Sequence, residues 1–250
     1  MKELELNKIY NEDCLETMKR MPDNFVNCII TSPPYNMRLR IRNGEYTQRE
    51  MGAHFSKKYT DFADALPMED YYKFHSKALK EMLRVSPIVF WNIQIVTGSK
   101  EAIFKIIGGF AKEITDIIIW DKGFGQPAMH NGVLNRGSEL IIIFEKERKD
   151  GRTFNKYCFE RGTMQDIWRI GRGGKGEEET HTAVFPIELV SNILKGWTKE
   201  NETIYDPFMG TGTTAMACKL LKRNYIGSEI SAEYTKLAED RIKAISNPLF

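Results

Sequence analysis

A glycine-containing loop near the end of the chain constrains the fold more than any other feature. The run Asp206-Pro-Phe-Met-Gly-Thr-Gly-Thr-Thr214 follows a short β-prone segment, residues 202–205, and precedes a segment of helical composition, residues 215–222. A second β-prone run, residues 225–230, leads to a helix for which Ser231 is a good N-cap. This order of strand, loop, helix, strand and helix is half of a doubly wound α/β domain.

The other strands must come from earlier in the chain, because two parallel strands alone do not make a stable sheet. Strands are predicted at residues 8–10, 26–31, 88–91, 117–120 and 140–144, and helices at residues 14–20 and 71–83. The alternation indicates an α/β fold with a mostly parallel sheet, in a single domain over residues 1–250. Two polar stretches, residues 36–66 and 145–180, are weakly periodic, and we expect them to be functional loops or small insertions.

Composition narrows the class of protein. A length of 250 residues suits one large domain, and the net charge of +2 neither requires nor excludes a nucleic-acid partner. The four cysteines lack the spacing of a metal site, and the sequence contains neither an apolar leader nor a membrane-length apolar run. We therefore expect a cytoplasmic protein with reduced cysteines, no bound metal and no membrane contact.

The glycine loop has the pattern of a cofactor site. Gly210 and Gly212 allow a ligand to approach the backbone, and the following helix offers free N–H groups. Glu229 lies 23 positions after Asp206, near the roughly 20-residue offset at which a carboxylate accepts hydrogen bonds from ribose hydroxyls. The pattern also fits a relaxed dinucleotide fingerprint, so NAD is an alternative candidate for the cofactor. Asp206 favours a cofactor that carries a cation, such as a methionine amino group, because a carboxylate repels a pyrophosphate.

The turn Thr31-Ser32-Pro33-Pro34-Tyr35 ends the predicted strand at residues 26–31, where open α/β sheets bind substrates. Proline has no N–H group, so this turn presents mainly hydrogen-bond acceptors. An aromatic amine that donates to the Ser32 oxygen and the Pro33 carbonyl is drawn towards a tetrahedral geometry, and its lone pair can attack a sulfonium methyl group. Tyr35 offers a ring that can stack on a base. The alternative interpretation is a rigid corner with a core tyrosine.

Together, the two motifs resemble those of the DNA methyltransferases that methylate amino groups. Their order, with the Ser-Pro-Pro-Tyr turn early and the glycine loop late, is similar to the circularly permuted β group of that family. The resemblance spans nearly the whole chain. It implies S-adenosylmethionine as the cofactor, a Rossmann-like methyltransferase fold with a seven-stranded sheet, and a target base flipped out of double-stranded DNA.

The resemblance also implies roles for individual residues. In the segment Asn11-Glu-Asp-Cys-Leu15, Asp13 is expected to contact the cofactor adenine. The segment His181-Thr-Ala-Val-Phe-Pro186 resembles one that lies beside the methionine pocket, although Thr182 replaces the usual proline. The implied catalytic residues are Ser32, Pro33, Pro34 and Tyr35. The implied cofactor residues are Asp13, Thr31, Phe185, Asp206, Phe208, Gly210, Gly212, Thr213, Thr214 and Glu229.

Basic residues in the two polar stretches are candidates for contact with DNA. Three arginines alternate directly after the catalytic turn, which places them on one side of an extended segment. The whole candidate set is Arg38, Arg40, Arg42, Lys57, Lys58, Arg169, Arg172 and Lys175. The alternative interpretation is a solvated surface, which is the commoner fate of charged runs.

The most consistent interpretation is a DNA methyltransferase that acts on an exocyclic amino group. In the family, serine before Pro-Pro-Tyr is associated mainly with cytosine N4, so we favour cytosine N4 over adenine N6. An NAD-dependent oxidoreductase and a non-catalytic nucleic-acid-binding module remain alternatives. The partners that we consider are double-stranded DNA, a second copy of the chain and a cognate restriction endonuclease.

Overall fold

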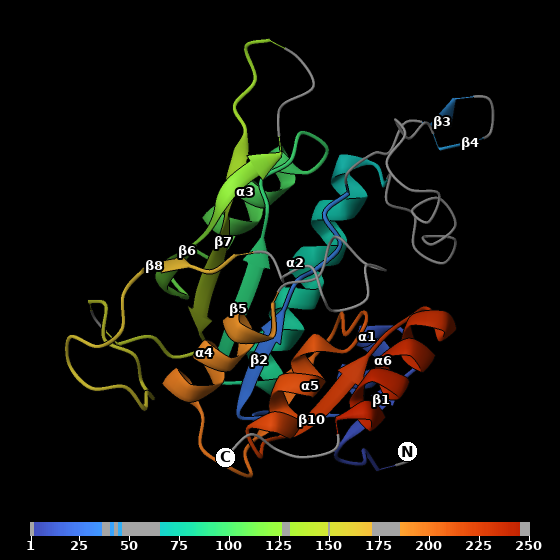
Figure 1. The fold of residues 1–250 in the computed structure, drawn as a ribbon, viewed down its shortest axis with the longest axis vertical. Coiled ribbons are helices and arrows are strands. Elements are labelled where there is room, and N and C mark those ends of the chain that lie inside the picture. The colour runs from blue at the N-terminus through green and yellow to red at the C-terminus, as the bar shows by residue number, and fades with distance from the viewer. Residues whose placement is uncertain are drawn as a thin grey trace.

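The main sheet contains strands from both ends of the chain (Figure 1). The computed structural model describes residues 3–36, 66–126, 131–149, 151–171 and 186–245, together with the backbone of a small ladder between β3 (Ile41–Arg42) and β4 (Glu45–Tyr46). In spatial order, the main sheet consists of β1 (Lys8–Tyr10), β10 (Asn224–Ser228), β9 (Thr203–Asp206), β2 (Cys28–Thr31), β5 (Ile88–Ile93), β7 (Arg136–Glu145), β6 (Ile114–Gln126) and β8 (Ile167–Arg169).

The sheet is mostly parallel, as the sequence predicts. The two antiparallel pairs are those that β7 makes with β5 and β6, whereas the pairs β1–β10, β10–β9, β9–β2, β2–β5 and β6–β8 are parallel. The chain leaves β2 towards β5 on one side and leaves β9 towards β10 on the other. The carboxyl ends of β2 and β9 therefore flank a topological switch point, where open α/β sheets bind ligands.

Helices cover both faces of the sheet (Figure 1). Residues of α1 (Cys14–Lys19), α2 (Met68–Val85) and α3 (Lys100–Gly109) pack in one apolar cluster. Residues of α4 (Ile187–Trp197), α5 (Thr213–Leu220) and α6 (Ala232–Ala244) pack in the other. β5 is buried along its whole length, because its alternate side chains enter both clusters.

The predicted strands and helices are present, and the cap at Ser231 is confirmed, since its side chain accepts a hydrogen bond from the Tyr234 N–H. The structure extends several of them, most of all β6 and β7, which form a long antiparallel hairpin. α3 and α4 were not predicted. The sequence of α4 does contain a helical pattern, because apolar residues recur at helical spacing and are all buried: Leu189, Val190, Ile193, Leu194 and Trp197.

The sheet has eight strands where the resemblance implied seven. The additional strand, β8, lies in the polar stretch 145–180 and pairs in parallel with β6 at the outer edge. It forms because Trp168 is buried there and because the Trp120 indole donates to the Ile170 carbonyl at 2.7 Å. Within the same stretch, Phe154 and Phe159 pack edge-on against Trp197 of α4. Part of this stretch is therefore built into the core.

Candidate active site

The two sequence motifs meet at the switch point between β2 and β9. Register places Ile29 opposite Tyr205, so the ends of the two strands lie side by side. The Thr31 hydroxyl donates to Asp206 Oδ1 at 2.7 Å, across 175 residues of sequence. The Ser-Pro-Pro-Tyr turn and the glycine loop therefore form one site at the carboxyl edge of the sheet.

Asp206 is a buried carboxylate held by neutral donors. Besides Thr31, the Phe208 N–H donates to Oδ1 at 3.0 Å and the Thr214 hydroxyl donates to Oδ2 at 2.6 Å. Burial raises the pKa of Asp206 from 3.8 to about 6, although these hydrogen bonds oppose the rise. No cation pairs with Asp206 among the residues that the structure describes. This environment fits a ligand that brings a positive charge to the carboxylate.

The glycine loop is held in shape by Glu229, which follows β10. Its two carboxylate oxygens each accept a backbone N–H at 2.8 Å, from Gly210 and from Ser231. Gly210 and Gly212 have φ values of +54° and +88°, which favour glycine. A Cβ atom on Gly212 would also lie 2.8 Å from Ala238 Cβ, so this glycine is required for packing against α6. Thr213 begins α5 directly after this turn.

Phe208, the side chain that follows Asp206-Pro, extends the site towards α2. It is half-buried, and its ring lies 6.1 Å from the ring of Phe74 and 6.0 Å from that of His75. Burial lowers the pKa of His75 to about 3, so this imidazole is neutral at physiological pH. The packing between the loop and α2 is therefore aromatic and uncharged at this point.

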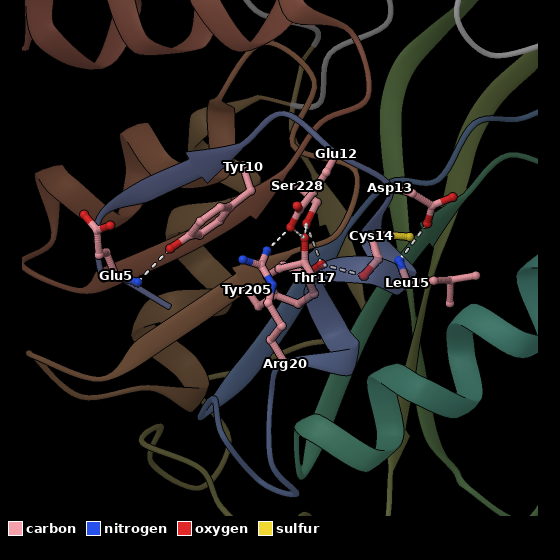
Figure 2. A network of polar contacts seen from close by, with 10 residues as sticks. All are labelled: Glu5, Tyr10, Glu12, Asp13, Cys14, Leu15, Thr17, Arg20, Tyr205 and Ser228. Atoms are coloured by element: carbon pink, nitrogen blue, oxygen red, sulfur yellow. Dashed lines mark hydrogen bonds and ion pairs between the residues drawn. The ribbon is translucent and has the colours of Figure 1, made fainter. Parts of the chain in front are cut away.

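Asp13 lies at the N-terminus of α1, where its side chain accepts the Leu15 N–H at 2.7 Å. A chain of buried hydroxyl groups joins α1 to the sheet, from Tyr205 through Ser228 to Thr17, at 2.7 and 2.8 Å (Figure 2). The Asp13 carboxylate lies apart from this chain of hydroxyls. Its cap position follows β1, which is the strand next to β10, so Asp13 stands at the same edge of the sheet as Glu229.

The Ser-Pro-Pro-Tyr turn is held by hydrogen bonds on several sides. Ser32 Oγ lies 2.9 Å from the Tyr35 hydroxyl, which donates to Glu139 Oε2 at 2.9 Å. The Tyr71 hydroxyl of α2 donates to the Pro34 carbonyl at 2.8 Å. Among the described residues, none donates to the Pro33 carbonyl. The Pro33 carbonyl, directly after Ser32 in the chain, is therefore a backbone acceptor without a donor among these residues.

Three residues of this network were missed by sequence reasoning. Asn92, at the end of β5, donates to Glu139 Oε2 at 2.8 Å and to the Tyr35 hydroxyl at 3.0 Å. Lys122 of β6 forms a buried ion pair with Glu139 of β7, at 2.9 Å. The rule that identified the Ser32 turn, a polar residue where a buried strand ends, also identifies Asn92. Lys122 and Glu139 have no such signal, because their proximity depends on the hairpin register.

The candidate DNA contacts are described only in part. Arg169 ends β8, and its side chain is 84% exposed, with Asp121 Oδ2 at 3.6 Å. An exposed pair of this length is weak, which leaves the guanidinium accessible to a phosphate. The other residues of the set, and Phe185 of the cofactor set, have side chains outside the described part of the structure: Arg38, Arg40, Arg42, Lys57, Lys58, Arg172 and Lys175.

Two features are absent from the described part of the structure. Within the described residues, no group of three or more histidine, cysteine, aspartate or glutamate side chains is arranged to hold a metal ion. In the same part of the chain, no helix has the length and apolar character that crossing a membrane requires.

Comparison with solved structures places the fold. The chain is similar to the cytosine-N4-specific PvuII DNA methyltransferase, with a TM-score of 0.71 and 16% identity over 97% of this chain and 88% of that one. It is also similar to the complex of M1.HpyAVI with S-adenosylmethionine, with a TM-score of 0.58 and 23% identity over 94% of this chain and 98% of that one.

Comparison of sequences places the family. The chain is 26% identical to the Type II methyltransferase M.BglII of Bacillus subtilis, over 93% of this chain and 68% of that protein. The family model of the N6/N4 DNA methylases matches residues 26–240, which include both the Ser-Pro-Pro-Tyr turn and the glycine loop. The chain therefore belongs to the N6/N4 DNA methylase family, and it is a DNA methyltransferase.

Proposed function

We propose that this protein transfers a methyl group from S-adenosylmethionine to the N4 amino group of a cytosine in double-stranded DNA. The observation that carries the proposal is the Ser32 hydroxyl, which is held by Tyr35 and directly follows Thr31, the residue that donates to the buried Asp206. The Pro33 carbonyl, next in the chain, is the second acceptor of the proposal. An amino group has two N–H donors, and two adjacent acceptors match them.

The residues around the switch point fit this cofactor. Asp206, which lacks a cationic partner among the described residues, would hold the methionine end, where the amino group is positive. Glu229 would accept hydrogen bonds from the ribose hydroxyls, and Asp13 would contact the adenine. When bound, the cofactor supplies an electrophilic methyl group on a positively charged sulfur.

The chain's own residues then act on the target base. Ser32 and the Pro33 carbonyl accept the two N–H groups and draw the nitrogen towards a tetrahedral geometry, which returns its lone pair from the ring. This lone pair would form the bond to the methyl carbon as the carbon–sulfur bond breaks and its electron pair stays on sulfur, and the nitrogen would then release one of its two protons to solvent. These hydrogen bonds strengthen as the nitrogen gains positive charge in the transition state, so they lower the barrier more than they tighten ground-state binding. The ring of Tyr35 is half-buried beside Ser32, and stacking of the flipped base on this ring is part of the proposal.

The choice of base rests on Ser32, which precedes Pro-Pro-Tyr as in the cytosine-directed members that the motif resembles. The same pair of acceptors suits adenine N6, which is the second candidate. We infer that the arginine-rich segment after the turn contacts DNA phosphates. We also infer a homodimer and a cognate restriction endonuclease as partners, supported by the Type II names of the relatives.

Expression in a host without DNA methylation, followed by long-read mapping of modified bases, tests this function. We expect N4-methylcytosine at one recurrent sequence, and none when Ser32→Ala is expressed to the same level. N6-methyladenine would transfer the assignment to the second candidate. A genome without modified bases, despite folded protein that binds S-adenosylmethionine, would contradict the proposal.

The role of Ser32 in methyl transfer can be separated from cofactor binding in vitro. Ser32→Ala should bind S-adenosylmethionine as the wild type does but lose about 2–4 kcal/mol of transition-state stabilisation, by analogy with the loss of one oxyanion-hole donor. The measurement is transfer of a labelled methyl group to DNA at saturating cofactor. Wild-type turnover by this variant would mean that the turn is only a structural corner.

A further inference from the structure

A row of polar side chains crosses the carboxyl end of the sheet beneath the catalytic turn. Asn92 of β5 lies opposite Ile141 of β7, and Glu139 of β7 lies opposite Trp120 of β6. Because strand side chains alternate, Asn92, Glu139 and Lys122 all project from the face that holds Ile141 and Trp120. Asn92 and Glu139 thus reach Ser32 and Tyr35, which follow the neighbouring strand β2, and Lys122 reaches Glu139.

The ion pair in this row is buried. The side chain of Lys122 is 2% exposed and that of Glu139 is 11% exposed, and Lys122 Nζ lies 5.6 Å from the centre of the Trp120 ring. Removing two charges from water is costly, and their mutual attraction often only offsets that cost. A buried pair is therefore weak evidence for stability, and its geometry is more informative about what it orients.

The pair fixes the direction of each hydrogen bond in the row. Glu139 Oε1 accepts from Lys122, and Oε2, which can only accept, receives hydrogen bonds from the Tyr35 hydroxyl and from Asn92. Tyr35 has one hydroxyl proton, and burial together with the charge of Glu139 raises its pKa, so the proton stays on the ring oxygen. The 2.9 Å contact between Tyr35 and Ser32 must then use the Ser32 proton.

This direction decides what Ser32 offers to a substrate. A serine that donates its proton to Tyr35 presents oxygen lone pairs on its other side, whereas a serine that receives a proton from Tyr35 has one of its lone pairs occupied. The Asn92 amide nitrogen is 3.4 Å from Ser32 Oγ, which is a long contact and leaves the oxygen available. The direction of the hydrogen bonds in the row therefore makes Ser32 an acceptor for a substrate.

We propose that Glu139, held by Lys122, is a positioning residue that sets the Ser32 hydroxyl as an acceptor for the target amino group, through Tyr35. This inference rests on the proposed role of Ser32. It assigns a function to the base of the β6–β7 hairpin, which carries no part of either sequence motif.

The Glu139→Gln variant should reverse the direction of the hydrogen bonds in the row. Gln has one carbonyl oxygen, and the charged Lys122 competes for it most strongly. The amide N–H₂ then takes the place of Oε2, and Asn92 must turn its Oδ1 towards it in place of its own N–H₂. The Gln amide also donates to the Tyr35 oxygen, so Tyr35 donates to Ser32 and occupies one of the two lone pairs of Ser32. In Glu139→Gln with Lys122→Met, no cation claims the carbonyl, which turns to Tyr35 and restores the original direction. A second substitution should therefore rescue the first.

The experiment measures single-turnover methyl transfer to DNA at saturating cofactor, with cofactor affinity and thermal unfolding recorded for each variant. We expect Glu139→Gln to slow transfer by about 10- to 100-fold with unchanged cofactor affinity. We expect the double variant to recover most of that loss. Lys156→Met with Glu202→Gln is the matched control, because this ion pair lies at the opposite end of the sheet, before β9; it should leave the rate unchanged.

The outcomes separate the positioning role from the alternatives. Wild-type transfer by Glu139→Gln would overturn the inference and leave the proposed function intact. A double variant that is as slow as Glu139→Gln, yet unfolds at the wild-type temperature, would also overturn it. If all rates follow the unfolding temperatures, the pair only stabilises the fold. Absence of transfer by the wild type itself would refute the proposed function, and the inference with it.

Discussion

Replacing Asp206 with Asn removes a buried negative charge from the cofactor site. We expect the free energy of unfolding to rise and the affinity for S-adenosylmethionine to fall. Without a ligand, the carboxylate has only neutral donors around it among the described residues, and burial raises its pKa from 3.8 to about 6. Asn is nearly the same size and keeps one oxygen for Thr31 and Phe208, while the Thr214 hydroxyl can rotate to accept from the new amide. The fold should therefore tolerate the change.

The size of the effect follows from the pKa. A difference between 3.8 and about 6, at 1.36 kcal/mol per pKa unit, corresponds to about 3 kcal/mol. Because the folded pKa is raised, the stability that this carboxyl group contributes is complete below pH 3.8 and is lost as the pH rises through 6. Asp206→Asn has no such loss. The variant should thus be up to about 3 kcal/mol more stable than the wild type at pH 8, with a much smaller difference at pH 4.

Urea denaturation of the unliganded proteins at pH 4 and pH 8 measures this difference, and calorimetry measures the cofactor affinity. We expect the stabilised variant to bind S-adenosylmethionine about 10- to 100-fold more weakly, because a charge-assisted hydrogen bond is worth about 1.5–3 kcal/mol. Asp240→Asn, an exposed carboxyl group on α6, is the control and should change neither quantity. A variant that is less stable than the wild type at pH 8, or a difference that does not depend on pH, would refute the reasoning.

Three further predictions test the loop, the ribose contact and the DNA contact. Gly212→Ala should lower the free energy of unfolding by about 1–3 kcal/mol, because its Cβ meets Ala238; Gly123→Ala, which has a similar positive φ but open space, should cost less in the same urea titration, and equal costs would exclude the clash. Glu229→Gln should weaken cofactor binding by about 1–3 kcal/mol in calorimetry, because Gln loses one of the two oxygens that accept from Gly210 and Ser231 and weakens the ribose hydrogen bonds, while unchanged affinity would remove Glu229 from the site. Replacing Arg38, Arg40 and Arg42 with alanine should reduce the number of counterions released on DNA binding, which flattens the dependence of affinity on salt in fluorescence anisotropy. A slope identical to that of the wild type would reject this contact.

Several local features of the fold and of the site could be predicted from the sequence alone, because they depend on local chemistry. The glycines at 210 and 212 adopt positive φ values that other residues rarely adopt, so their spacing after a β-prone run predicted a strand, a turn and a helix. The Ser231 side chain caps a helix through a contact three residues away. The two prolines after Ser32 remove donors from the turn whatever surrounds it. Each of these inferences depends on neighbours within a few positions.

Tertiary structure decided which of these pieces meet. The contact between Thr31 and Asp206 joins residues 175 positions apart, and only the order of β2 and β9 in the sheet brings them together. Glu139 reaches Tyr35 because the register of β7 against β5 and β6 places it there. A shift of one residue in that register would turn Glu139 to the opposite face. Register and strand order are settled by the packing of the whole sheet, so no local pattern in the sequence specifies them.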